Sequence, residues 1–431
     1  MKTIAEALET GDAGAAVAAV AARTDLVEAL REVAHAAAPR LDVDHPPVPA
    51  HVHPYQALGA AAGLLPLLPR HALLPLAQAA WYLALSPRIG AHREHEARIV
   101  GEEVHLSKSL LSAIRQGEAR DAARLFNGLL GRRERALLGD LFFQGAAEDT
   151  VSSGHKLSVA VLGWVLARQV GWEHTPALTL WPVVHYVASP PKEASVFLTA
   201  SRALAKSMVD LEVAGRNAGR SVSELAGLRE ALGAGKGEEA AQAAAAALKS
   251  GTGGDGVLDE VARRCALAAL VDGDAPLHAL AFTHAARFAF TFSRSGHRLL
   301  PVVEAAVIAA GLPTGGPSLP GLAPVRDPAA ALNEMALAIE MGDTGEALAL
   351  LRGYLESGGA PDEAVATLAR EASKEDAHAT GGHSLVYAHA ALQEYRHSHG
   401  PDRWLSLAAL TSWLARLEHR REVVEALGAF V

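Results

Sequence analysis

The sequence has few of the features that mark secreted, nucleic-acid-binding or metal-thiolate proteins. Cys265 is the only cysteine among the 431 residues, which excludes an intramolecular disulfide and a zinc site built on several thiolates. The formal net charge is -9, and Lys and Arg are interspersed with Glu and Asp along the chain. We therefore expect no basic face, and neither a nucleic acid nor a membrane among the partners.

Targeting and membrane-spanning segments are not expected either. The first residues, MKTIAEALETGDAG, carry Glu6 and Glu9 where a signal peptide has an apolar stretch. The longest apolar stretch, residues 55–86, is interrupted by prolines, an arginine and a histidine, which argues against a spanning helix. With a single cysteine, these features favour a cytoplasmic protein. The chain also has no Walker loop, dinucleotide fingerprint, GxSxG or HExxH motif, so no nucleotide cofactor is expected.

Alternating runs of β-branched residues, which are typical of strands, are nearly absent. Ala-rich and Leu-rich segments with helical spacing dominate instead, for example residues 119–142. We predict an all-α fold, and with 50% hydrophobic residues the chain can bury a large core. We expect one all-α domain over residues 1–431, with the Gly- and Pro-rich residues 311–324 as the best candidate linker.

Four stretches share a pattern in which a helix ends near a Gly, an acidic residue follows, and an Ala-rich helix begins. The glycines are Gly11, Gly117, Gly237 and Gly342. Each is expected to end its helix in the left-handed conformation, and the acidic residue suits the positive N-terminal end of the next helix. We predict a helical-repeat bundle of four quasi-repeats, at about residues 1–100, 101–215, 216–325 and 326–431, packed around a central pocket.

A histidine follows each of these glycines at nearly the same distance. The interval is 42 positions from Gly11 to His53, 38 from Gly117 to His155, 41 from Gly237 to His278 and 41 from Gly342 to His383. The last three histidines are each followed by Leu two residues later and by a small residue eight later. The first copy has Tyr55 in place of that Leu, and an extended segment before Pro54 would put His51 and His53 on one side, so either can be its counterpart.

Helix-breaking residues precede each histidine, which places the imidazole in the first turn of a helix. The helix dipole disfavours a protonated imidazole there, and a neutral imidazole can bind a metal ion or act as a general base. If the four helix starts converge, their nitrogens suit Fe, Cu, Ni or Zn better than Mg or Ca. The alternative is a binding or scaffold protein, in which structural histidines lie along a ridge of an open solenoid.

Other residues receive secondary roles. His284 and His389 follow His278 and His383 by six positions, a rotation of about 240°, so they are expected to neighbour the site. The residues expected to face a substrate are His51, Tyr55, His284, Tyr387 and His389. We interpret HREHE at residues 92–96 as a solvated helix face and His185 as a core histidine. The tryptophans interpreted as core are Trp164, Trp172, Trp181, Trp404 and Trp413, of which one or two can wall an aromatic pocket.

Three segments resemble the recurrent histidine segments of the questin oxidase-like family. They are GHKLSVAVLGWVLA at 154–167, LHALAFTHAARF at 277–288 and GHSLVYAHAALQEY at 382–395, and the similarity extends from about His51 to His399. The resemblance implies an all-α oxygenase that opens an anthraquinone-type polyketide ring in a Baeyer-Villiger-like reaction. It also implies an active site formed by His53, His155, His278 and His383, with His155, His278 and His383 catalytic and all four able to bind iron.

Some members of that family complete an iron site with a lysine shortly after the last histidine. Here Val386, Tyr387 and Ala388 occupy the region, without a lysine. Two versions therefore remain open, an Fe(II) enzyme and a cofactor-independent oxygenase. In the second, a histidine removes a phenolic proton and the phenolate reacts with dioxygen in a dry pocket. The expected partners are an aromatic polyketide and dioxygen, with a homodimer possible.

Overall fold

The computed structural model describes residues 2–38, 49–68, 70–86, 100–132, 134–172, 176–190, 192–217, 219, 222–315, 319, 321, 325 and 327–428. Residues 49–51, 176–179 and 222–224 are described by their backbone only. Helices account for 77% of the structure, and the described residues form no β-strand, which confirms the all-α prediction. Within these ranges, no helix has both the length and the apolar character needed to cross a membrane. The HREHE segment and residues 316–318, 320 and 322–324 of the predicted linker lie outside the described residues.

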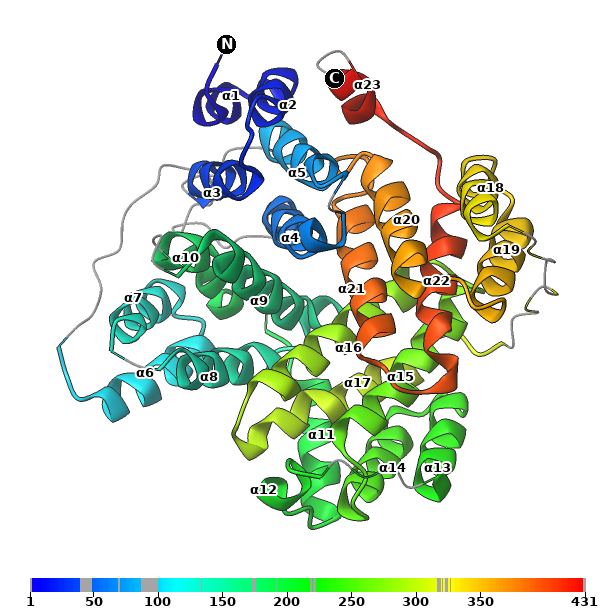
Figure 1. The fold of residues 1–431 in the computed structure, drawn as a ribbon. Coiled ribbons are helices and arrows are strands. Elements are labelled where there is room, and N and C mark those ends of the chain that lie inside the picture. The colour runs from blue at the N-terminus through cyan, green and yellow to red at the C-terminus, as the bar shows by residue number, and fades with distance from the viewer. Residues whose placement is uncertain are drawn as a thin grey trace.

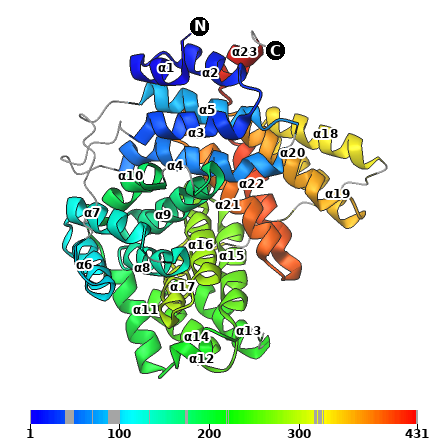
Figure 2. The same cartoon turned by 60° about the vertical axis from the view of Figure 1, so that its left-hand side comes forward.

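The first helices extend from the end of the molecule where the last helix also packs toward its centre (Figures 1 and 2). They are α1 (Ile4–Thr10), α2 (Ala13–Ala21), α3 (Leu26–Ala37), α4 (Pro49–Leu64), the 3-10 turn η2 (Leu65–Leu67) and α5 (Leu73–Leu85). α2 contacts α5 and also α23 (Glu422–Gly428). Val17 of α2 and Val423 of α23 belong to one small apolar cluster, so burial of apolar surface joins the two ends of the chain.

The middle of the chain forms two further groups of helices. The first contains α6 (Glu103–Gln116), α7 (Ala119–Leu130), α8 (Arg135–Ala147), α9 (Val151–Val170) and α10 (Pro176–Ala188). The second contains α11 (Ser195–Lys206), α12 (Leu211–Ala214), α13 (Val222–Gly233), α14 (Gly237–Lys249), α15 (Gly254–Ala269), α16 (Asp274–Phe292), η3 (Gly296–Leu299) and α17 (Leu300–Ala310). In both views, α12 and α14 lie at the end opposite α1 and α23 (Figures 1 and 2).

The last group packs beside α5 and α16. It contains α18 (Pro328–Glu340), α19 (Thr344–Glu356), α20 (Pro361–Lys374), α21 (His383–His397), η4 (Pro401–Trp404), α22 (Leu405–Leu414) and α23. Its helix α20 contacts α5, and its helix α21 contacts both α4 and α16. The last group is thus tied both to the N-terminal helices and to the middle of the chain.

Three of the four predicted helix-ending glycines have the expected left-handed backbone. Gly11, Gly117 and Gly342 cap α1, α6 and the turn after α18, with φ of 69°, 81° and 74°. The prediction for Gly237 is wrong, because it is the first residue of α14, and the left-handed residue is Gly235 with φ of 76°. The segment GAGKGEE contains several glycines, and the spacing alone did not identify the one that ends α13.

Four helices at the centre contact one another in a closed ring, in the order α4, α9, α16, α21 and back to α4 (Figure 1). These are the helices that carry the four histidines predicted to be equivalent. They run in the same direction, because the histidines near their N-terminal ends meet and so do residues further along, such as His284 of α16 and His389 of α21. Parallel packing therefore brings four histidine-bearing helix starts to one end of the ring.

Residues without a side chain allow the helices of this ring to approach closely. A Cβ at Gly59 of α4 would lie 2.6 Å from the carbonyl oxygen of Leu162 in α9, and one at Gly63 would overlap the ring of His389. Both distances are shorter than real Cβ contacts allow, so glycine is required for this packing. The small residues set the distances between helices that decide how near the histidines come to one another.

Candidate functional site

The four imidazoles of His53, His155, His278 and His383 form a closed cluster, which we call the histidine cluster. The ring centroids are 4.8 Å apart for His53 and His155, 5.3 Å for His155 and His278, 4.6 Å for His278 and His383, and 5.4 Å for His53 and His383. The four residues come from four different helices and are far apart in the sequence. They converge on one point, whereas the histidines of an open solenoid would lie along a ridge.

Left-handed residues introduce two of these histidines. Gly381 and Gly382, with φ of 61° and 84°, precede His383, which is the first residue of α21. Three consecutive residues, Ser152 to Gly154, have φ of 52°, 58° and 83° and interrupt α9 just before His155. For the two serines such a backbone costs about 1–2 kcal/mol each, so the surrounding contacts must stabilise this turn.

The other two histidines lie later in their helices than expected. His278 is the fifth residue of α16 and His53 the fifth of α4, so both lie in the second turn. The predicted extended segment before Pro54 is wrong, because α4 is helical from Pro49 through Pro54. Val52 and Tyr55 are buried in the core, and this packing outweighs the local preference of the residue before a proline. The side chain of His51 lies outside the described residues.

Burial keeps the histidine cluster neutral. It lowers the pKa of His53 to about 4 and the pKa values of His155 and His383 to about 3, and neighbouring histidines add to each decrease. The pKa of His278 is also lowered by burial, although the backbone and carboxylate of Asp274 oppose the decrease. Neutral imidazoles were predicted from the helix dipole, but desolvation is the main cause.

Hydrogen bonds occupy some of the ring nitrogens of the cluster. Nε2 of His53 and Nε2 of His155 are 2.7 Å apart, and the backbone of Ser152 partly opposes the decrease in the pKa of His155. Nδ1 of His278 lies 2.5 Å from the hydroxyl of Tyr387, whose ring stacks on His383 at 4.8 Å. Nε2 of His383 is buried and has no partner among the described residues, so it remains able to bind a ligand atom or an ion.

A pocket of about 590 Å³ leads from the surface to His383. Its walls come from the start of α16, the loop before α21 and the segment that begins at the end of α22, and they include Asp272, Asp274, Thr380, Trp413, Arg416 and Arg420. Our sequence reasoning placed Trp413 among core or pocket residues but did not single out Asp274. Asp274 precedes His278 by one helical turn, and that spacing was the available signal.

The remaining predicted site residues lie at differing distances from the cluster. Tyr387 is in contact with it, whereas Tyr55 is buried in the core, where burial raises the pKa of its hydroxyl. His284 and His389 pair with each other at 5.0 Å between ring centroids, and Nδ1 of His284 is 3.6 Å from Oε1 of Glu394. Neither histidine of this pair lines the pocket that reaches His383.

The residues interpreted as core are mostly buried. His185 is 3% exposed and stacks on Trp181, which is 4% exposed. Trp164 is 2% exposed, and Trp172 and Trp404 pack partly buried against the main core. Of the five tryptophans, Trp413 is the one that lines the pocket at His383.

The region shortly after His383, where a lysine ligand is missing, is apolar at Val386. Val386 is buried within α21. Lys156, next to His155, is also buried, but its Nζ binds Oδ2 of Asp149 at 2.6 Å and the carbonyl of Ser189 at 2.5 Å. Its amine therefore links α9 to Asp149, which precedes the turn, and to the residue after α10, and it does not supply the missing lysine.

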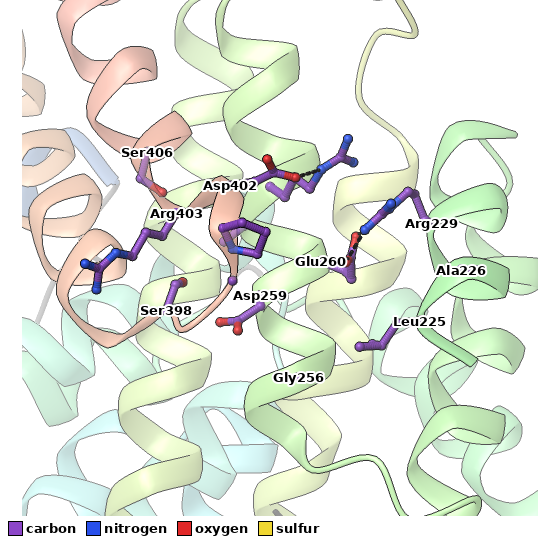
Figure 3. Close-up of a pocket in the computed structure, with 14 residues that line it drawn as sticks. Leu225, Ala226, Arg229, Gly256, Asp259, Glu260, Ser398, Asp402, Arg403 and Ser406 are labelled. Atoms are coloured by element: carbon purple, nitrogen blue, oxygen red, sulfur yellow. Dashed lines mark hydrogen bonds and ion pairs between the residues drawn. The ribbon is translucent and has the colours of Figure 1, made fainter. Parts of the chain in front are cut away.

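A second pocket, of about 400 Å³, lies between α13, α15 and the start of α22 (Figure 3). Arg229 binds Glu260 at 2.6 Å and Arg263 binds Asp402 at 2.8 Å across it. Asp259 on its wall binds the buried Arg287. Because these charges are paired within the protein and none of the predicted site residues lines the pocket, the histidine cluster is the better candidate site.

Comparison of the chain with models of known protein families, with curated proteins and with solved structures gave no match. Over the residues that the structure describes, no three His, Cys, Asp or Glu side chains are arranged as they would be around a metal ion. One distance that departs from such an arrangement is the 2.7 Å between Nε2 of His53 and Nε2 of His155. Two nitrogens that each bind a tetrahedral ion at about 2.0–2.1 Å would be about 3.3 Å apart. In the structure the two rings are hydrogen-bonded to each other.

The lowered pKa values predict how stability depends on pH in the metal-free protein. An unfolded histidine has a pKa of about 6.5 and takes up a proton as the pH falls, whereas the buried cluster stays neutral down to about pH 4. The free energy of unfolding should therefore decrease between about pH 6.5 and pH 4, by at most about 1.4 kcal/mol per pH unit for each histidine. Urea unfolding after chelator treatment tests this, with a smaller slope expected for His383→Gln. Equal slopes for the two proteins would contradict the assignment.

Proposed function

We propose that this chain is an oxygenase that opens the ring of an anthraquinone-type aromatic polyketide at the histidine cluster. The observation that carries the proposal is the convergence of four neutral imidazoles, one of which, His383, lines a pocket and has a buried, unpartnered Nε2. The resemblance of three short segments to the questin oxidase-like family supplies the substrate class and the reaction.

Within this proposal, the low pKa values favour iron over a cofactor-free mechanism. An imidazole whose pKa is about 3 is a weak base toward a phenol at neutral pH, because general bases act best with a pKa near the working pH. The same low pKa leaves no proton to compete with a metal ion at pH 7. His53, His155, His278 and His383 would hold the iron, and His53 and His155 would exchange their mutual hydrogen bond for it.

Bound Fe(II) would supply the binding and activation of dioxygen. The residues of the chain would position the organic substrate and exclude water. Trp413 offers an aromatic surface in the pocket wall, and Asp274 offers a carboxylate that can accept a hydrogen bond from a phenolic hydroxyl. The largely buried side chains of the cluster would keep bulk water from the reacting atoms.

We also propose that the molecule contains four quasi-repeats around this site. In support, α4, α9, α16 and α21 form a closed ring, and each places its histidine in its first or second helical turn or just after a kink. Three of the four repeats share the left-handed glycine. The helices that precede the ring members differ in number and length, so the repeats are approximate.

Oxygen uptake by protein purified without a metal-affinity tag and then loaded with Fe(II) tests the proposed function. With an anthraquinone or its hydroquinone as substrate, we expect uptake of dioxygen and a product that contains oxygen from ¹⁸O₂. Uptake that persists in the presence of a chelator, with no iron in the protein, would show the cofactor-free version. The absence of uptake with and without Fe(II), across a panel of aromatic polyketides, would contradict the proposal.

A further inference from the structure

His278 is the member of the histidine cluster whose Nδ1 lies against the hydroxyl of a tyrosine. Its Nδ1 lies 2.5 Å from the hydroxyl oxygen of Tyr387. The Tyr387 hydroxyl is 3.4 Å from the backbone carbonyl oxygen of Asp274. The Tyr387 hydroxyl therefore lies within hydrogen-bond reach of both the ring nitrogen and the carbonyl oxygen.

The His278 imidazole, the Tyr387 hydroxyl and the Asp274 carbonyl can form both hydrogen bonds at once in one arrangement of their hydrogens. A carbonyl oxygen only accepts, so the bond between Tyr387 and Asp274 uses the single hydrogen of the Tyr387 hydroxyl. The Tyr387 oxygen then accepts from Nδ1–H, and its own hydrogen points to the carbonyl of Asp274. If Tyr387 donated to a bare Nδ1, its hydroxyl would have no hydrogen left for the carbonyl of Asp274. The satisfied arrangement leaves Nε2 of His278 with a free lone pair.

Contacts on the far side fix Asp274 and Tyr387. Oδ1 of Asp274 accepts a hydrogen bond from Nε1 of Trp413 at 2.9 Å, which holds the first residue of α16 against α22. The Tyr387 ring lies between the edge of Trp413, at 5.2 Å, and the face of His383, at 4.8 Å and an interplanar angle of 15°. Three helices thus fix the group that holds His278.

We propose that Tyr387 and Asp274 are positioning residues that hold His278 as the Nδ1–H tautomer, so that its Nε2 is free to act at the cluster. The proposal rests on the proposed function only for the use made of Nε2. Hydrogen bonds of this kind commonly select the tautomer and orientation of a functional histidine. Tyr387, predicted to face the substrate, instead acts through His278.

Nitrogen-15 NMR of the metal-free, histidine-labelled full chain at pH 7.5 tests the proposal directly. His278→Gln assigns the signals. We expect Nδ1 of His278 to carry the proton in the unmodified protein and Tyr387→Phe to raise the share of the Nε2–H form. Trp413→Phe should act in the same direction with a smaller effect. Co(II) affinity, followed by its visible absorption, should fall about 10- to 100-fold in Tyr387→Phe.

Tyr186→Phe is the matched control, because the Tyr186 hydroxyl is buried without a hydrogen-bond partner among the described residues. It should leave the His278 signals and Co(II) affinity unchanged. An Nε2–H tautomer in the unmodified protein, or unchanged His278 signals in Tyr387→Phe, would overturn the proposal. If the expected tautomer is found but no substrate leads to oxygen uptake, the proposed function fails and the positioning role stands.

Discussion

Replacing His383 with Ala or Gln should lower oxygen uptake by at least about 10³-fold and remove tight binding of Fe(II) or Co(II). His383 is the cluster member that lines the pocket, and its Nε2 is buried without a partner. Its loss removes one of four nitrogen donors and the group nearest to an incoming substrate. Catalytic groups of this kind contribute about 10²–10⁴-fold, and a missing ligand adds to the loss. Steady-state oxygen uptake and a Co(II) titration measure the two effects.

His378→Ala is the matched control for this change. His378 is exposed, lies five residues before His383 on the same loop and contacts the edge of Tyr82. The His378→Ala variant should bind Co(II) and take up oxygen like the unmodified protein. Near-normal turnover in His383→Gln, with an unchanged circular dichroism spectrum, would exclude the cluster as the site of reaction.

Lys156→Met should destabilise the protein by about 3–5 kcal/mol, which is the usual cost of breaking a buried ion pair. Lys156 and Asp149 are 1% and 5% exposed, and the lysine also binds the carbonyl of Ser189. Without it, the remaining cation beside Asp149 among the described residues is the partly exposed Lys192, at 3.4 Å. The segment that leads into the left-handed turn at Ser152–Gly154 would lose a buried ion pair. Urea unfolding at pH 7.5 measures the effect.

The exposed pair Lys236–Glu239 supplies the control for this prediction. Its side chains are 66% and 52% exposed, so Lys236→Met should change the free energy of unfolding by less than about 1 kcal/mol. If Lys156→Met also changes the free energy of unfolding by less than about 1 kcal/mol, the Lys156–Asp149 pair does not stabilise the region of the turn. In a Lys156→Met protein that still folds, we also expect weaker Co(II) binding, because His155 directly follows that turn.

The helical class and the meeting of the four histidines could be anticipated from the sequence. Helical spacing of Ala and Leu indicates helices without reference to distant residues, and the repeated interval from Gly to His selects one residue from each of four helices. The interval contains helices of different lengths, yet it places His155, His278 and His383 near comparable helix starts. Close packing then follows from small residues such as Gly59 and Gly63.

The details that the sequence did not yield depend on contacts between distant residues. Pro54 and the residue before it favour an extended backbone locally, but burial of Val52 and Tyr55 keeps α4 helical. The pairing of Tyr387 with His278 joins residues 109 positions apart, and the hydrogen bond from Trp413 to Asp274 joins residues 139 apart. His284 and His389 form a pair because α16 and α21 are parallel, a relation that no local pattern indicates.

Metal content after purification without an affinity tag is the most direct test of the central claim. Elemental analysis should find about one iron per chain after anaerobic loading with Fe(II) and removal of excess metal. The His155→Ala/His383→Ala double variant should bind none, and His378→Ala should bind as much as the unmodified chain. Iron that remains bound to the double variant, or no iron in the unmodified chain, would contradict the account.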